Sequence, residues 1–240
     1  MNMMVDVHTH ILPGMDDGAA TAEIALEMLR KQAAQGVTAV VLTPHFYRER
    51  EDIPRFLARR ERAMAQLQAA IDALPEQERV QLPELILGAE VAWRPNMKNW
   101  EDIEKLCIGS TRNLLLELPN TKWTHQVLNT VYNLLNMGIT PIIAHLDRYM
   151  QPQRYASLEH VLSMGVPVQI SAGALQRPFI GCGLVRMMGR ESNVFLASDC
   201  HSRNHRPPNM AEGVAKLRQK LEENAVADIL KRGNQLIVPE

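Results

Sequence analysis

Seven short apolar segments recur along this chain and alternate with longer stretches whose apolar residues have helical spacing. Each segment has the length of a buried strand, and the segments are residues 3–7, 39–42, 84–87, 113–116, 140–144, 166–170 and 194–197. Buried strands that alternate with helices form parallel βα units, because a parallel strand requires a crossover connection. The sequence therefore predicts an α/β fold, either a closed barrel or an open doubly wound sheet.

Capping residues define the predicted helices between these strands. Thr21 can cap a helix that ends near Gly36, and Asp52 can cap the next helix, with Pro54 in its first turn. Further helices are predicted at about 124–137, at 157–164 and from about 209 onward. Because the connections are short and contain no linker, we expect one domain over residues 1–240.

Histidine and carboxylate side chains follow the predicted strands at their C-terminal ends. These side chains are His8, His10, His45, Glu90, Glu117, His145, Asp199 and His201. In a βα barrel, the C-terminal strand ends meet on the face where active sites are built. Any one of these residues alone could be an ordinary polar group of a loop, but eight of them at six strand ends are hard to obtain by chance. We therefore favour the barrel over the open sheet.

The chemistry of these side chains favours a metal centre. His8 and His10 are two residues apart, so in a strand both imidazoles point to one side, although such pairs alone are common. Histidine nitrogens with carboxylate oxygens suit manganese, iron or zinc, whereas Cys107, Cys182 and Cys200 lack the paired spacing of a thiolate site. The number of candidate ligands exceeds the needs of one ion and predicts two or three. Paired ions activate water, so hydrolysis is the expected chemistry.

Two arginines indicate the substrate class. Arg148 and Arg206 come three and five residues after candidate histidine ligands, so both would lie at the rim of the same face. A guanidinium group matches phosphate oxygens in a bidentate way, although each arginine could instead form a surface salt bridge. Together with the metals, the two arginines favour phosphoester hydrolysis.

Cys200 and Arg206 also have the C-x5-R spacing of the cysteine-dependent tyrosine phosphatases. That chemistry needs a loop of backbone N–H groups and a thiol with a lowered pKa. Here Asp199 precedes the cysteine, Pro207 follows the arginine, and no glycine loosens the loop. Since a neighbouring carboxylate raises the pKa of a thiol, the sequence disfavours a thiol nucleophile.

Composition excludes several other classes of function. The formal net charge is −1 at pH 7, whereas a nucleic-acid-binding protein would have a basic excess. The first residues are too polar for a signal peptide and no run of about 18 apolar residues occurs, so we expect a cytoplasmic protein without membrane insertion.

One segment is locally basic, with six arginines from Arg48 to Arg62. Such a group of arginines usually forms the solvent-exposed face of a helix. Whether this helix instead binds an acidic tail, or another subunit of a homo-oligomer, is left open.

Six motifs taken together resemble the PHP (polymerase and histidinol phosphatase) superfamily. They are DVHTHILPGMDDGA, TPH, GAE at Glu90, LEL at Glu117, AHLDRY and SDCHS, and they span nearly the whole chain. The chain is most similar to the manganese-dependent bacterial protein-tyrosine phosphatases of capsule and exopolysaccharide synthesis, the CpsB/CapC family. The resemblance implies a distorted seven-stranded (β/α)7 barrel, similar to a TIM barrel, with a three-metal cluster. It also implies that the target is the phosphotyrosine-containing tail of a bacterial tyrosine kinase.

The resemblance assigns ligands to each of the three ions. The groups are His8, His10, Glu90 and Asp199; Glu90, Glu117 and His145; and Asp17, His45 and His201, with Asp16 as the weaker choice for the third acid. Arg148 and Arg206 would hold the phosphate, and a metal-bridging hydroxide would be the nucleophile. Leu146 and Asp147 stand where the family usually has Pro-Glu, which could change how Arg148 is aimed, and Cys200 replaces a small residue.

Two alternatives to a protein-tyrosine phosphatase are left open. One is a small-molecule phosphatase of the histidinol-phosphate type, which substrate turnover would distinguish. The other is a regulatory module that retains metals without turnover, as in some polymerase-linked PHP domains. The complete ligand set argues against the second alternative, because loss of activity should leave gaps among the nine positions.

Overall fold

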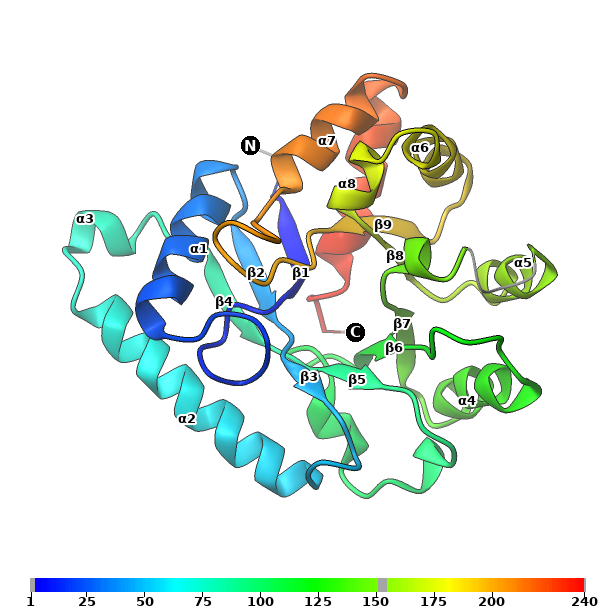
Figure 1. Ribbon diagram of the computed structural model, residues 1–240, viewed down its shortest axis with the longest axis horizontal. Helices are drawn as coiled ribbons and strands as arrows, with labels where there is room; N and C mark the ends of the chain where they lie inside the picture. Colours follow the sequence, from blue (N-terminus) through cyan, green and yellow to red (C-terminus); the bar gives the residue numbers. More distant parts are fainter. Residues whose placement is uncertain (1–2, 151–154, 240) are drawn as a thin grey trace.

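Parallel strands surround a common axis in this protein, and most helices lie on the outside of the strands (Figure 1). The computed structural model describes residues 3–150 and 155–239. The strands are β1 (Val5–Thr9), β2 (Ala39–Leu42), β3 (His45–Phe46), β4 (Glu84–Leu87), β5 (Glu90–Ala92), β6 (Asn113–Glu117), β7 (Thr140–Ile143), β8 (Val168–Ser171) and β9 (Val194–Ala197). They form one sheet in the order β1-β2-β4 and another in the order β3-β5-β6-β7-β8-β9. All the strand pairs within these two sheets are parallel.

Two of the seven predicted strands are each extended by a second, short strand. Thr43 and Pro44 separate β2 from β3, and Gly88 and Ala89 separate β4 from β5. Pro44 has no N–H group to donate, so one ladder hydrogen bond is missing just after the end of β2. After a two-residue break, β3 continues β2 and β5 continues β4. The nine strands therefore occupy seven strand positions, as expected for a distorted (β/α)7 barrel. This is the predicted fold, with the distortion located at these two breaks.

The end of β1 meets the segment directly after β9 beside the candidate metal ligands. The His10 N–H donates to the carbonyl oxygen of Cys200 at 2.9 Å, and the Asp199 N–H donates to the carbonyl oxygen of His8 at 3.0 Å. A parallel bridge joins Thr9 to Cys200 between these bonds. Backbone hydrogen bonds thus hold residues near the two ends of the chain at one place.

The described helices connect the strands along the outside. They are α1 (Ala22–Ala34), α2 (Ile53–Asp72), α3 (Glu76–Arg79), α4 (His125–Asn136), α5 (Tyr155–Ser163), α6 (Ile180–Arg190), α7 (Met210–Arg218) and α8 (Glu223–Gln235). Four 3-10 helices complete the set, namely η1 (Met97–Asn99), η2 (Ile103–Leu106), η3 (Leu146–Arg148) and η4 (Ala172–Gln176). Both predicted caps are confirmed, because Thr21 accepts from the Ile24 N–H at 3.4 Å and Asp52 accepts from the Arg55 N–H at 2.8 Å. Helix α6 was not predicted, since its three glycines lower its helix propensity.

Apolar side chains fill the interior between the strands. The cluster comprises Val5, Val7, Ala39, Val41, Ile108, Leu115, Ile142, Ala144, Phe195, Ala197 and Leu236. Leu236 comes from the C-terminal segment, where the Asn113 Nδ2–H group donates to its carbonyl oxygen at 2.8 Å. Since Asn113 begins β6, this packing covers the N-terminal ends of the strands and leaves the C-terminal ends for polar side chains. None of the helices in the described ranges is long and apolar enough to cross a membrane.

Candidate metal centre

The nine predicted ligands lie together at the C-terminal ends of the strands. They come from β1, β3, β5, β6, and the segments after β1, β7 and β9, and are His8, His10, Asp17, His45, Glu90, Glu117, His145, Asp199 and His201. Four of them lie within strands, whereas the sequence analysis placed them after strands. His8 is in β1 and Glu117 ends β6. His45 and Glu90 begin β3 and β5, where they pair with each other in parallel register. This pairing brings an imidazole and a carboxylate into contact across the sheet.

Glu90 lies at the centre of the cluster, and its side chain is only 1% exposed. Its Oε2 atom lies 3.2 Å from His8 Nε2, 3.2 Å from His10 Nε2 and 3.0 Å from His45 Nδ1. Its Oε1 atom lies 2.9 Å from His145 Nε2. A buried carboxylate in contact with four imidazoles is well placed to bridge two cations, because each oxygen can serve a different ion.

The hydrogen bonds around His8 and His10 fit a cation. Gln169 Oε1 accepts a bond from the His145 backbone N–H at 3.0 Å, so the same oxygen also accepts the His8 Nδ1–H at 2.8 Å. Asp16 Oδ2 accepts the His10 Nδ1–H at 2.7 Å. With both Nδ1 atoms protonated, neutral rings would present two Nε2 lone pairs to each other at 3.1 Å. This arrangement is repulsive without a positive charge between the nitrogens, and the donor set therefore fits a divalent ion.

A second group forms where His145 meets two carboxylates. His145 Nε2 lies 2.9 Å from Glu90 Oε1 and 3.5 Å from Glu117 Oε1. Burial lowers the pKa of His145, but its hydrogen bonds to Glu117 and Glu90 outweigh burial and raise the pKa to about 9. The backbone of His145 has a φ of 32°, in the left-handed region. Such strain is typical of functional positions, and here it directs the ring to the carboxylates.

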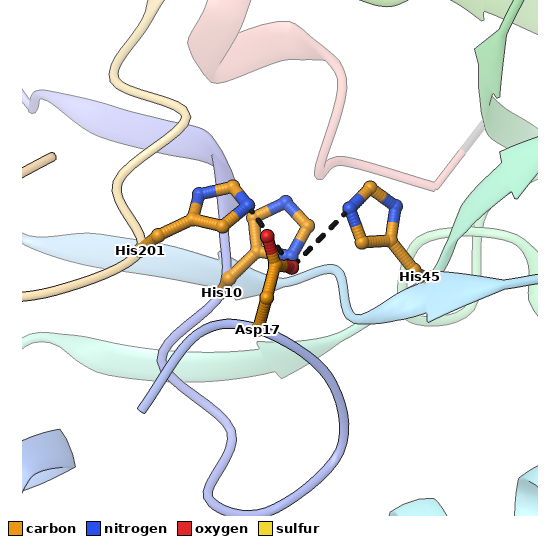
Figure 2. Close-up of side chains that lie close together, drawn as sticks. All are labelled: His10, Asp17, His45 and His201. Carbon is orange, nitrogen blue, oxygen red and sulfur yellow. Dashed lines mark ion pairs between the residues drawn. The ribbon is translucent and has the colours of Figure 1, made fainter. Parts of the chain in front are cut away.

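A third group surrounds Asp17, as Figure 2 shows. Its Oδ1 atom lies 3.6 Å from His45 Nε2 and 3.5 Å from His201 Nε2. The rings of His10 and His201 stack with their centroids 3.7 Å apart, so His10 borders this group as well as the first. The side chain of Asp17 is 69% exposed, and it could bind an ion from the solvent side of the cluster.

Asp16 has a different role from Asp17 in this structure. Besides its bond to His10, its Oδ2 atom accepts the backbone N–H of His45 at 2.8 Å, and its Oδ1 atom accepts the Gly18 N–H at 2.9 Å. Both oxygens are therefore occupied by groups that they position. Asp17, with its carboxylate directed to two imidazoles, is the better candidate ligand.

Gly18 allows the loop that carries both acids to fold back onto β1. A Cβ atom at this position would lie 2.0 Å from the carbonyl oxygen of His10, so any other residue would displace the loop. The next residue, Ala19, donates its N–H to the same carbonyl oxygen at 2.9 Å. The glycine of the Asp-Asp-Gly sequence thus positions the acids beside the histidines.

Gln169 is a contributor that the sequence analysis missed. Its side chain is fully buried in β8, where it connects His8 to the backbone of His145. By accepting the Nδ1–H of His8, it leaves the Nε2 atom free to bind an ion. The only sequence signal was a lone polar residue within the apolar strand Val166–Ile170 that we predicted, and the structure places this strand at Val168–Ser171.

The two predicted phosphate-binding arginines converge on one carboxylate. Arg148 and Arg206 both form ion pairs with Asp199 Oδ2, and the Arg206 Nη2 distance is 2.5 Å. Asp147, which departs from the usual motif, accepts the Ser171 N–H at 2.9 Å and anchors the turn that carries Arg148. With Asp147 in place of the residue that is usual in the family, Arg148 is therefore still directed to the cluster.

Two clefts open on either side of the cluster. The first, of about 560 Å³, is lined by Met15, Asp16, Asp17, His45, Tyr47, Arg50, Glu51, Arg55 and Arg59. The second, of about 310 Å³, is lined by Tyr47, Ala92, Trp93, Arg94, Glu117, Leu118, Pro119, Asn120, His145, Arg148 and Tyr149. Tyr47 borders both clefts, and each cleft includes candidate ligands, namely Asp17 and His45 in the first and Glu117 and His145 in the second.

Residues 4–238 match the protein family described as capsular polysaccharide synthesis, CpsB/CapC. The chain belongs to this family. Among its relatives, the tyrosine-protein phosphatase CpsB of Streptococcus agalactiae is 26% identical over 220 residues, which cover 87% of each chain. The tyrosine-protein phosphatase YwqE of Bacillus subtilis is 27% identical over 211 residues, covering 83% of this chain and 78% of YwqE.

Solved structures agree with the fold of a CpsB/CapC protein. The study of YwqE from Bacillus subtilis and CpsB from Streptococcus pneumoniae, described as unique metal-dependent tyrosine phosphatases, provides a chain with a TM-score of 0.83. That match has 23% identity and covers 98% of this chain and 94% of the other. A phosphotriesterase homology protein from Escherichia coli matches more distantly, with 14% identity and a TM-score of 0.56 over 99% of both chains. The fold is thus shared with a metal-dependent phosphatase.

The environment of Cys200 in this CpsB/CapC chain is unsuitable for a nucleophile. The residue is fully buried, and the Gln32 side chain donates to its Sγ atom at 3.7 Å. Burial, and then the charge of Asp6, raise the pKa of the thiol far above its ordinary value. The thiolate that a C-x5-R mechanism requires would not form at neutral pH.

We therefore expect Cys200→Ser to retain activity toward an aryl phosphate within about threefold, because no step depends on the thiol. Steady-state kinetics of the metal-loaded variant would measure this. Iodoacetamide applied to the folded protein should label the exposed Cys182 and spare Cys200, which provides an internal control. A loss of about 10³-fold with unchanged metal content would favour the thiol route.

Proposed function

We propose that this chain is a metal-dependent phosphomonoesterase and that its substrate is phosphotyrosine in a flexible protein segment. The observation that carries the proposal is the convergence of nine potential metal ligands and two guanidinium groups at one end of the barrel. The donor set of imidazoles and carboxylates suits two or three divalent ions, with manganese preferred over iron or zinc. The names of the relatives support phosphotyrosine as the substrate.

The chain's own residues would prepare the cluster for hydrolysis. Divalent ions held there would supply an activated water and neutralise charge on the phosphoryl oxygens. Glu90 is positioned to hold two ions at once, and the hydrogen bonds from Gln169 and Asp16 fix the rings of His8 and His10. Fixed ligands need little reorganisation during the reaction, which is the usual source of electrostatic catalysis.

Arg148 and Arg206 would bind the phosphoryl group. Both guanidinium groups contact the same oxygen of Asp199, so two positive charges share one carboxylate. A phosphate dianion beside them could accept bonds from both arginines, because its oxygens match the guanidinium fork. Asp199 would then be released to bind an ion, and the arginines would orient the phosphoryl group above the cluster.

The second cleft suits the aromatic part of phosphotyrosine. It contains Arg148 and His145 together with the rings of Tyr47 and Trp93. The Trp93 ring is held in place because its Nε1–H donates to Thr130 Oγ1 at 2.9 Å. Aromatic side chains contact a phenyl ring favourably, so a tyrosyl group could lie there while its phosphate reaches the arginine.

The proposed physiological target is the phosphotyrosine-containing tail of a bacterial tyrosine kinase, encountered in the cytoplasm. The description of the family as capsular polysaccharide synthesis supports a role in producing surface polysaccharide. A flexible tail fits a site that opens to solvent through two clefts, because an extended segment can enter it without unfolding a domain.

Comparison of two substrates would test the proposed function. The manganese-loaded protein is expected to hydrolyse a phosphotyrosine peptide with a kcat/KM at least about 10²-fold higher than that for histidinol phosphate, since the aromatic cleft and open surface favour the peptide. Phosphate release would be measured for both at equal metal concentration. A preference for histidinol phosphate would support the small-molecule alternative, and turnover of neither would favour the regulatory module.

A further inference from the structure

The first cleft joins the candidate metal centre to the basic segment at the start of α2. One part of its lining consists of Asp17 and His45 from the cluster, and another consists of Arg50 and Arg55. Tyr47 lies between this cleft and the one proposed for the tyrosyl ring. A peptide whose phosphotyrosine occupies the second cleft would therefore have neighbouring residues close to the first.

Most charged groups in the first cleft already have partners within the chain. Asp16 is bonded to His10, and Glu51 is paired with Arg59. The other nitrogen of the Arg59 guanidinium donates to the carbonyl oxygen of Met15 at 2.7 Å, which ties α2 to the metal-binding loop. Arg59 thus has a structural role, and its guanidinium group neutralises Glu51.

Arg50 and Arg55 are different because their charges are not balanced. Both are exposed, and no carboxylate in the described part of the chain lies within 4.0 Å of either guanidinium group. The guanidinium carbon of Arg50 lies 4.2 Å from the centroid of the Tyr47 ring, which holds it at the border between the two clefts. The first cleft therefore contains two positive charges that an incoming anion could neutralise.

Arg55 lies in the first turn of the 20-residue helix α2, which begins directly after the N-cap Asp52. The Asp52 carboxylate accepts the Arg55 backbone N–H at 2.8 Å and already offsets the partial positive charge of the helix start. The attraction for an anion in this cleft therefore comes from the guanidinium groups of Arg50 and Arg55.

We propose that the cleft at Arg50 and Arg55 is a subsite for an acidic side chain of the substrate segment. The inference rests on the proposed function, because it assumes that the phosphotyrosine of the same segment is held at the metal centre. A carboxylate a few residues from the phosphotyrosine would form charge-assisted hydrogen bonds with the two guanidinium groups. The site would then select acidic phosphotyrosine sequences over neutral ones.

Kinetics with paired peptides would test the subsite. One phosphotyrosine peptide carries glutamates on both sides of the phosphotyrosine, and its partner carries glutamines there. The wild-type protein with manganese should show a kcat/KM about tenfold higher for the acidic peptide, and this preference should weaken as salt increases. The variant Arg50→Gln/Arg55→Gln should reduce the preference to about twofold or less while its turnover of a small aryl phosphate is unchanged.

A matched control comes from two other arginines of the same segment. Arg48 and Arg62 are exposed and do not line the cleft, so Arg48→Gln/Arg62→Gln removes equal charge but should keep the preference. The proposal is overturned if the wild-type protein shows no preference, or if both double variants lose it equally. It is also overturned if Arg50→Gln/Arg55→Gln changes the oligomeric state, because the cleft would then be a contact between subunits.

A binding measurement separates this inference from the proposed function. Absence of aryl phosphate turnover by the manganese-loaded wild-type protein would reject the phosphatase assignment. Fluorescence anisotropy with dye-labelled acidic and neutral peptides would then test the subsite independently of catalysis. Tighter binding of the acidic peptide that is lost only in Arg50→Gln/Arg55→Gln supports the subsite, and equal binding of both peptides overturns it.

Discussion

Treatment with EDTA is expected to abolish hydrolysis of an aryl phosphate, by at least about 10³-fold, and added manganese is expected to restore it. The expectation follows from the Nε2 atoms of His8 and His10, which lie 3.1 Å apart beside the carboxylate of Glu90 and form a donor set that suits a divalent ion. Without ions, the buried carboxylates of Glu90 and Asp199 would retain their contacts to imidazoles and arginines, but water would not be activated. Initial rates and elemental analysis of the same samples would measure both effects.

Restoration by different ions would identify the preferred metal. The EDTA-treated protein, after removal of the chelator, would be titrated with manganese, iron or zinc, and magnesium would serve as an oxygen-preferring comparison. Manganese should restore the highest rate, and magnesium should restore little because imidazoles dominate the cluster. Full activity in the presence of EDTA, with no metal detected, would contradict the proposed mechanism.

Glu90→Gln is expected to remove both bound metal and activity, with a loss of at least about 10³-fold in kcat/KM. Glutamine has almost the same shape as glutamate but lacks its charge, so it cannot balance two cations. The two oxygens of Glu90 contact four imidazoles, and no other predicted ligand has so many such contacts in the described parts of the chain. Metal content and aryl phosphate turnover would be measured on the purified variant.

Glu84→Gln provides the matched control for this variant. Glu84 begins β4, at the end of the barrel opposite the cluster, and is exposed. The same chemical change there should leave metal content and activity within about twofold of the wild-type values. Circular dichroism would establish that both variants are folded. If Glu90→Gln retained a full complement of metal and normal turnover, Glu90 would not be a bridging ligand.

The alternation of apolar segments with capped helices predicted an α/β fold, the polar residues at the strand ends favoured a barrel over an open sheet, and the family resemblance implied its distorted seven-stranded form. Each buried strand had to be followed by a helix to return the chain, and Thr21 and Asp52 marked two helix starts correctly. The ends of β2 and β4 were predicted correctly, but the short strands β3 and β5 that follow them were not predicted. A strand that ends at Pro44 looks the same in sequence whether or not a short strand follows, because a pair such as His45 with Glu90 is formed between segments far apart in the chain.

The sequence by itself determined which kinds of side chain occur at the strand ends, and hence a metal-binding chemistry and a phosphate-like substrate. Only the tertiary structure decided which atoms face one another. Gln169 selects the free nitrogen of His8 from 161 residues away, and Asp16 is occupied by positioning His10 while Asp17 remains free to bind. The structure also separates Arg59, which is paired with Glu51, from Arg55 on the same helix, which has no carboxylate partner among the residues that the structure describes. Side-chain protonation and charge balance depend on neighbours in space, and a linear pattern does not specify those neighbours.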